Sequence, residues 1–137
     1  MGMTVDLSQL KRGIAALIAQ TRQNELTALQ QIADHVSGAA KDRAPIDAGN
    51  LTGDISGTVQ SDPATGQKGA VISVPLNANS KYYAIPMHEH TYNLGKLSQG
   101  KQERNGVTVG NGYIRRAMDD SRDDIRAIIQ DNLKKGM

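Results

Sequence analysis

The sequence predicts a single α+β domain spanning residues 1–137, in which a small antiparallel β-sheet packs against a long N-terminal helical block and a C-terminal amphipathic helix. Apolar residues recur at helical spacing before residue 44 and again after residue 113. Between these blocks, residues 50–60 alternate strictly between polar positions and positions that are apolar or glycine. Helical blocks on either side of a few strands are typical of α+β folds.

The first helical block is expected over residues 6–44. Asp6 and Gln9 form a variant of the capping box at its start. Ala44 precedes Pro45, and this position disfavours helical geometry, so the helix should end there. The first apolar register is Leu7, Leu10, Ile14, Leu17 and Ile18, and the second is Leu26, Leu29, Ala33, Val36 and Ala40. The two registers are out of phase around residues 21–24, which predicts either one long drifting helix or two helices with a bend near Arg22.

The sheet is expected within residues 50–88, after a turn at Asp47 and Gly49. The apolar face of the first strand is formed by Leu51, Gly53, Ile55, Gly57 and Val59. Glycines on this face let another backbone approach closely, and Ala33 and Ala40 of the second register match them in size. We therefore place the N-terminal helix on this sheet. A return strand over 70–76 completes a hairpin, and 82–87 is a candidate third strand interrupted by Pro86.

The remainder of the chain is expected to be a loop followed by a helix. Residues 89–112 hold five glycines and an Asn105-Gly106 turn, with a possible short strand at 107–109. A loop of this length is usually functional or disordered. Residues 113–135 form an amphipathic helix whose basic end, Lys134 and Lys135, favours the helix dipole, and Gly136 is a candidate cap.

The net charge of +2 conceals an uneven distribution. Residues 81–116 carry six basic groups against two acidic ones, a net +4: Lys81, Lys96, Lys101, Arg104, Arg115 and Arg116 against Glu89 and Glu103. A solvated loop and a patch that binds DNA or an acidic partner both fit this segment. The final helix carries an acidic stripe, defined as Asp119, Asp120, Asp123 and Asp124, beside Arg122 and Arg126.

Composition and motifs exclude several classes of site. The chain has no cysteine, so disulfides, thiolate metal sites and thiol catalysis are ruled out. No apolar run approaches the roughly 20 residues needed to span a bilayer, and neither a Walker loop nor a nucleophile elbow is present. His88-Glu89-His90 is the one cluster that resembles a metal site, but two imidazoles leave zinc short of a third ligand. We expect no enzymatic activity, no cofactor and no metal.

Four short motifs occur in a fixed order within residues 26–133. They are the helix end Ala40-Lys41-Asp42-Arg43-Ala44-Pro45, the turn Asp47-Ala48-Gly49-Asn50-Leu51 leading to Ile55, Tyr83-Ala84 followed by His88-Glu89, and the helix start Tyr113-Ile114-Arg115-Arg116-Ala117. In this order they resemble the bacteriophage head–tail joining proteins, a group that includes tail-completion, minor-capsid and neck proteins. The resemblance implies a non-enzymatic virion protein, assembled in the host cytoplasm, that forms a ring between the head connector and the tail tube. Such rings are most often hexameric, contact other neck and tail proteins, and surround the channel through which DNA passes.

A ring built head to tail needs two different, complementary surfaces on each subunit. Our hypothesis is that the acidic stripe of one subunit meets Lys96, Lys101 or Arg104 of its neighbour, with the 89–112 loop ordering against a partner ring or facing DNA. Two alternatives from other classes remain open. One is a small DNA-binding module that uses the basic segment 81–116, and the other is a metal-dependent hydrolase centred on His88, Glu89 and His90.

Overall fold

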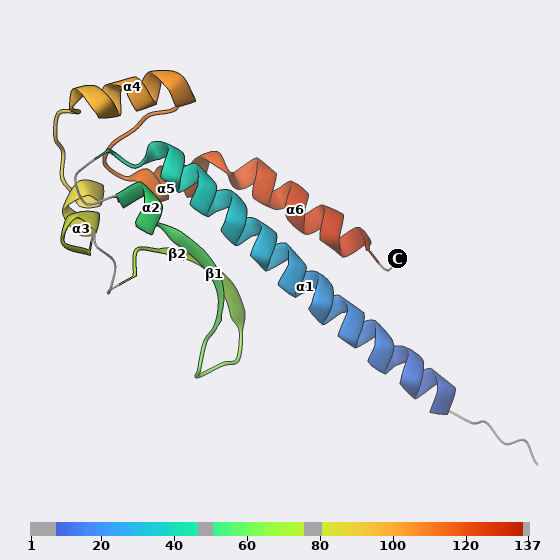
Figure 1. The fold of residues 1–137 in the computed structure, drawn as a ribbon. Coiled ribbons are helices and arrows are strands. Elements are labelled where there is room, and N and C mark those ends of the chain that lie inside the picture. The colour runs from blue at the N-terminus through green and yellow to red at the C-terminus, as the bar shows by residue number, and fades with distance from the viewer. Residues whose placement is uncertain (1–7, 47–50, 76–80, 136–137) are drawn as a thin grey trace, which may run out of the picture.

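A computed structural model describes residues 8–46, 51–75 and 81–135, without the side chains of residues 8–10 and 81–82 (Figure 1). The elements in order are α1 (Ser8–Arg43), α2 (Leu51–Asp54), β1 (Ser56–Ser61), β2 (Lys68–Ser73), α3 (Lys81–Glu89), α4 (Lys96–Asn105), α5 (Tyr113–Asp120) and α6 (Arg122–Lys134). A two-stranded antiparallel sheet and the C-terminal helices pack against α1, so the predicted α+β class is confirmed.

The N-terminal block is one continuous helix rather than two. Its 36 residues extend for about 54 Å at the usual rise of 1.5 Å per residue. It ends as predicted before Pro45, with a last N–H···O bond of 2.9 Å from Ala44 to Ala40. The predicted cap at Asp6 and the Leu7 and Leu10 side chains lie outside the described residues.

The two apolar registers of α1 have different surroundings. In the second register Ala33, Val36 and Ala40 are buried against the hairpin and α5. In the first register Ile14, Leu17 and Ile18 are all exposed, because this part of the helix extends beyond the other elements (Figure 1). Only the C-terminal half of α1 therefore serves as a packing surface within one copy of the chain.

The predicted hairpin is confirmed, with a later start. The strands pair from Ser56↔Ser73 to Ser61↔Lys68. Residues 51–54, expected as strand, instead form the helical turn α2. Leu51 and Ile55 are both buried, and residues four apart share a side in a helix as well as in a strand, so alternation alone could not separate the two. The predicted turn at Asp47 and Gly49, and Leu76, lie outside the described residues.

One of the two predicted glycine contacts is confirmed. A Cβ added to Gly57 would collide with the carbonyl oxygen of Ala33 and lie 3.1 Å from Ser37 Cβ, so only glycine lets β1 approach α1 this closely. Gly53 is exposed in the helical turn α2 rather than in a strand.

The third strand predicted at 82–87 is wrong, because this segment is the helix α3 with Pro86 inside it. Its last carbonyls are satisfied by groups outside the helix. Tyr92 Oη donates to Met87 O at 2.6 Å, and the Gly112 N–H donates to His88 O at 2.7 Å. These tertiary hydrogen bonds outweigh the strand propensity of the tyrosines and isoleucine.

The long loop predicted over 89–112, with a short strand at 107–109, is also wrong. Ten of its residues form α4, and no strand is present at 107–109. The predicted Asn-Gly turn is where this helix ends, since Gly106 adopts a left-handed φ of 67° and its N–H donates to Gln102 O at 3.0 Å.

The predicted helix over 113–135 is present with a break at Ser121, which separates α5 from α6. The Ser121 N–H lies 3.1 Å from Ala117 O and 3.2 Å from Met118 O. The candidate cap Gly136 lies outside the described residues.

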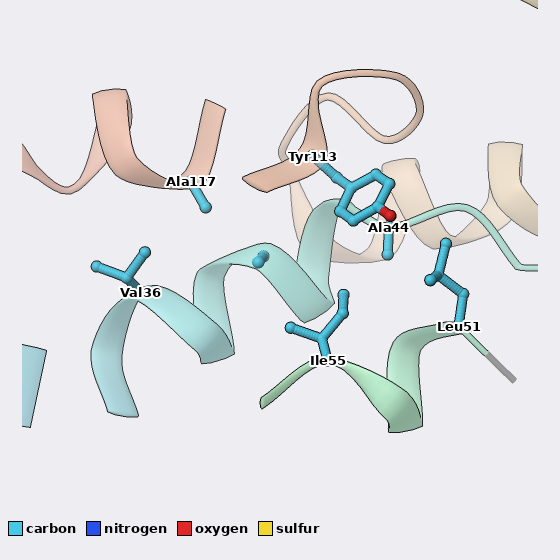
Figure 2. Close-up of a cluster of buried hydrophobic side chains, with 7 residues drawn as sticks. Val36, Ala44, Leu51, Ile55, Tyr113 and Ala117 are labelled. Atoms are coloured by element: carbon cyan, nitrogen blue, oxygen red, sulfur yellow. The ribbon is translucent and has the colours of Figure 1, made fainter. Parts of the chain in front are cut away.

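The core lies where the end of α1 meets α2, the start of β1 and α5 (Figure 2). Its buried residues are Val36, Ala40, Ala44, Leu51, Ile55, Tyr113 and Ala117. Tyr113 is the one aromatic ring in this cluster, and its hydroxyl donates to Ala84 O of α3 at 2.7 Å. The core thus joins the helix end, the hairpin and the C-terminal helices.

Gly57→Ala should destabilise the fold by about 1–3 kcal/mol, because the new methyl group forces β1 away from α1. Urea unfolding measures the loss. Gly69→Ala in β2 is the matched control, since a Cβ there meets no atom within 4 Å. Equal stability of the two variants would contradict the close approach of β1 to α1.

Candidate subunit interface

Lys101 is a structural anchor and not an exposed contact residue. Its side chain is buried, and its ammonium donates to Lys41 O and Ala44 O, each at 2.6 Å, and to Thr52 Oγ1 at 2.9 Å. All three ammonium donors are therefore used. The two carbonyls belong to the C-terminal end of α1, where the helix dipole favours a positive charge. This contact attaches α4 to α1 and α2.

Burial lowers the pKa of Lys101 from its ordinary value of 10.5, the neighbouring Asp42 carboxylate opposes this shift, and Arg104 adds to it. The unfolded chain therefore keeps this proton to a higher pH than the folded chain does. The stability contributed by this group is complete above pH 10.5 and decreases as the pH falls through the folded-state pKa.

The remaining basic residues of the predicted interface lie at the two ends of α4. Lys96 and Arg104 are both exposed. Elsewhere in the basic segment, Arg116 donates to Asn111 Oδ1 at 3.2 Å, Arg115 is exposed, and the Lys81 side chain lies outside the described part. The six positive charges of residues 81–116 therefore do not form one exposed patch.

The four aspartates of the acidic stripe are all exposed, and they divide by partner into a pair bound to α1 and a pair, named here the outward pair, bound only to arginines of α6. Asp120 binds the buried Arg43 at 3.0 Å, and Asp124 lies 3.1 Å from His35 Nε2, so both hold α5 and α6 against α1. The outward pair is Asp119 and Asp123, which contact Arg122 at 3.2 Å and Arg126 at 3.9 Å within their own helical segment. Such exposed ion pairs contribute little to stability, so these two carboxylates remain available to another molecule.

The His88-Glu89-His90 cluster contacts other protein groups. His88 Nδ1 lies 2.9 Å from Glu89 Oε1, and His88 Nε2 lies 3.4 Å from the Arg115 N–H. The imidazole also makes an edge-on contact with the Tyr113 ring, with centroids 4.9 Å apart. Across the described residues, no group of three or more His, Cys, Asp or Glu side chains is placed to hold a metal ion.

An apolar groove that was not predicted from the sequence lies between α1 and α6, which run side by side (Figure 1). It has a volume of about 430 Å³, and its apolar lining includes Leu17, Ala28, Leu29, Ile32, Ile129 and Leu133. Two hydrogen bonds, each of 2.8 Å, join the two sides of the groove near the C-terminal end of α6. Asn24 Nδ2 donates to Lys135 O, and Asn132 Nδ2 donates to Gln31 Oε1. The phase shift between the two registers of α1 was the signal for this groove, because it turns Ile14, Leu17 and Ile18 away from the hairpin side.

Comparison of the chain with models of known protein families, with characterised proteins and with solved structures found no match. In the described part of the chain, no helix combines the length and the apolar character needed to cross a membrane.

Lys101→Met should lower the free energy of unfolding by about 1–3 kcal/mol at neutral pH, because three oxygen acceptors lose their donor. Lys96→Met, on the exposed start of the same helix, is the matched control and should be near neutral. The difference between wild type and Lys101→Met should grow as the pH rises toward 10.5, as the lowered pKa requires. Chemical denaturation at several pH values measures both effects, and a flat difference across this range would contradict the lowered pKa.

Proposed function

We propose that this protein is a structural component of the phage neck or tail that forms a ring at the head–tail interface. The observation that carries the proposal is the convergence of its four family-like motifs. Ala44, Leu51, Ile55, Tyr113 and Ala117 come from three of them and belong to one buried cluster, and the fourth supplies Ala84, whose carbonyl binds the Tyr113 hydroxyl. Motifs that are distant in sequence but share one core are expected when they specify a common fold.

The ring contact is proposed to join the outward acidic pair to the exposed ends of α4. Asp119 and Asp123 on the C-terminal helices and Lys96 and Arg104 on α4 form two separate surfaces of opposite charge. A head-to-tail ring requires two such surfaces on each subunit. Lys101, Asp120 and Asp124 are not assigned to this contact, because each already binds a group of its own copy.

Reversing the charge of the outward pair tests this contact. Asp119→Lys combined with Asp123→Lys should convert rings into smaller species, because each ring contact then joins like charges. Negative-stain images and sedimentation of the purified protein, alone and with tail tubes, measure the change. Asp131→Lys, which alters another exposed aspartate of α6, is the matched control and should leave rings intact.

The absence of rings in the wild-type protein, both alone and with tail tubes, would contradict the proposed function. The DNA-binding alternative would have to do without Lys101 as a phosphate contact, because this side chain is buried in contacts with its own chain. Duplex affinity that falls steeply with salt would favour that alternative over the ring.

A further inference from the structure

One face of α1 carries a stripe with no assigned role. It follows the helical spacing of three and four residues, and its members are Ile14, Leu17, Ile18, Thr21, Glu25, Ala28, Leu29 and Ile32. We name these eight residues the α1 stripe. Ile14, Leu17 and Ile18 are 50%, 60% and 47% exposed, and Leu17 lies at one end of the groove beside α6, which Ala28, Leu29 and Ile32 also line. The N-terminal half of the stripe is therefore largely exposed, and the C-terminal half lies in the groove.

The α1 stripe is symmetric about Gln23. Ile14 and Ile32 are both nine residues from this centre, Leu17 and Leu29 six, Ile18 and Ala28 five, and Thr21 and Glu25 two. Two copies of the helix lying antiparallel across this centre would place each apolar side chain of one at the level of an apolar side chain of the other. The N-terminal half of the stripe of each copy would then meet the groove of its partner.

The charges near the centre favour the antiparallel direction. In that arrangement Glu25 of one copy lies within one residue's rise of Arg22 of the other, so opposite charges meet twice. A parallel arrangement would instead place Glu25 beside Glu25 and Arg22 beside Arg22. Neither residue forms an ion pair with any other described residue. A polar centre within an apolar seam is also a known way of fixing helix register.

A second pair of opposite charges lies at each end of the contact between the two α1 helices. Lys11 is twelve residues before Gln23, and His35 is twelve residues after it. Asp124 lies 3.1 Å from the His35 ring, at the inner edge of the acidic stripe. Antiparallel pairing therefore brings the Lys11 ammonium of one copy toward the Asp124 carboxylate of the other, and the exposed start of α1 gains an acidic partner.

We propose that two copies of this chain pair through α1, antiparallel about a two-fold axis near Gln23, with the N-terminal half of each α1 filling the groove between α1 and α6 of the other. In this pair, α1 and α6 of one copy and α1 and α6 of the other form a four-helix bundle. Such a contact uses the same surface on both subunits and is complete with two copies. It is therefore distinct from the ring contact, and it does not rest on the proposed function.

Disulfide trapping tests the geometry, since the natural chain has no cysteine. In Ile18→Cys/Ala28→Cys the two thiols are ten residues apart on one helix, about 15 Å, so they cannot bond within one copy. Mild oxidation should yield a covalent dimer of the double variant. The single variants Ile18→Cys and Ala28→Cys should stay largely monomeric on a non-reducing gel. No dimer in the double variant, or an equal yield in either single variant, would overturn the antiparallel register.

Solution mass tests the surface independently. In Asp119→Lys/Asp123→Lys protein, which lacks the proposed ring contact, light scattering should give twice the 14.7 kDa mass of one chain, and adding Ile18→Asp should weaken dimerisation at least ten-fold, because it buries an unpaired carboxylate between the paired helices. Adding Leu97→Asp instead, at a 70% exposed site on α4, is the matched control and should leave the dimer intact. Circular dichroism should show that both variants are folded. A monomeric Asp119→Lys/Asp123→Lys protein, or a dimer that persists when Ile18→Asp is added, would overturn the pairing, whereas an absence of rings in wild-type protein would count only against the proposed function.

Discussion

The fold depends on the close packing of β1 and α5 against the C-terminal half of α1. The hairpin reaches this helix at Gly57, where no side chain separates the strand from the Ala33 backbone. The small side chains of Ala33, Ala40 and Ala117 let the packed elements approach closely. The space that remains is filled by the larger side chains of Val36, Leu51, Ile55 and Tyr113 (Figure 2). A chain without phenylalanine or tryptophan has few large side chains to bury, and close backbone approach compensates for them.

The end of α1 is fixed by cations as well as by packing. Lys101 binds its last carbonyls, and Arg43 joins the helix end to Asp120 of α5. Both cations are buried near the end of α1. The last carbonyls of a helix lack intrahelical partners and lie at the negative end of its dipole, so this position favours cations. These contacts hold α4 and α5 beside the same helix end, and they explain why Lys101 of the basic segment is buried and why Asp120 of the acidic stripe, although exposed, is paired with α1.

The N-terminal half of α1 has the opposite character. Its start extends beyond the other elements (Figure 1), and its Ile14, Leu17 and Ile18 side chains, at helical spacing, are exposed. Exposed apolar surface of this kind commonly marks a site of association. The two associations proposed above use different surfaces, because the ring contact joins α4 to the outward acidic pair, whereas the two-fold contact joins α1 to the groove beside α6. A protein of a multi-component assembly can use both, since one contact closes a ring and the other ends at two copies.

The sequence by itself determined the α+β class, the helical character of the first block and its end before Pro45, the hairpin and the amphipathic C-terminal segment. These features follow from local periodicity and from proline and glycine stereochemistry, which act within a few residues. Tertiary structure alone decided that residues 51–54 and 81–89 are helical. Leu51 is buried in the core, and Gly112 and Tyr113, far along the chain, donate to the carbonyls of His88 and Ala84. It likewise decided that Lys101 and two of the four stripe aspartates are engaged within the molecule, since a charged residue looks the same in sequence whether it faces solvent or a distant helix end.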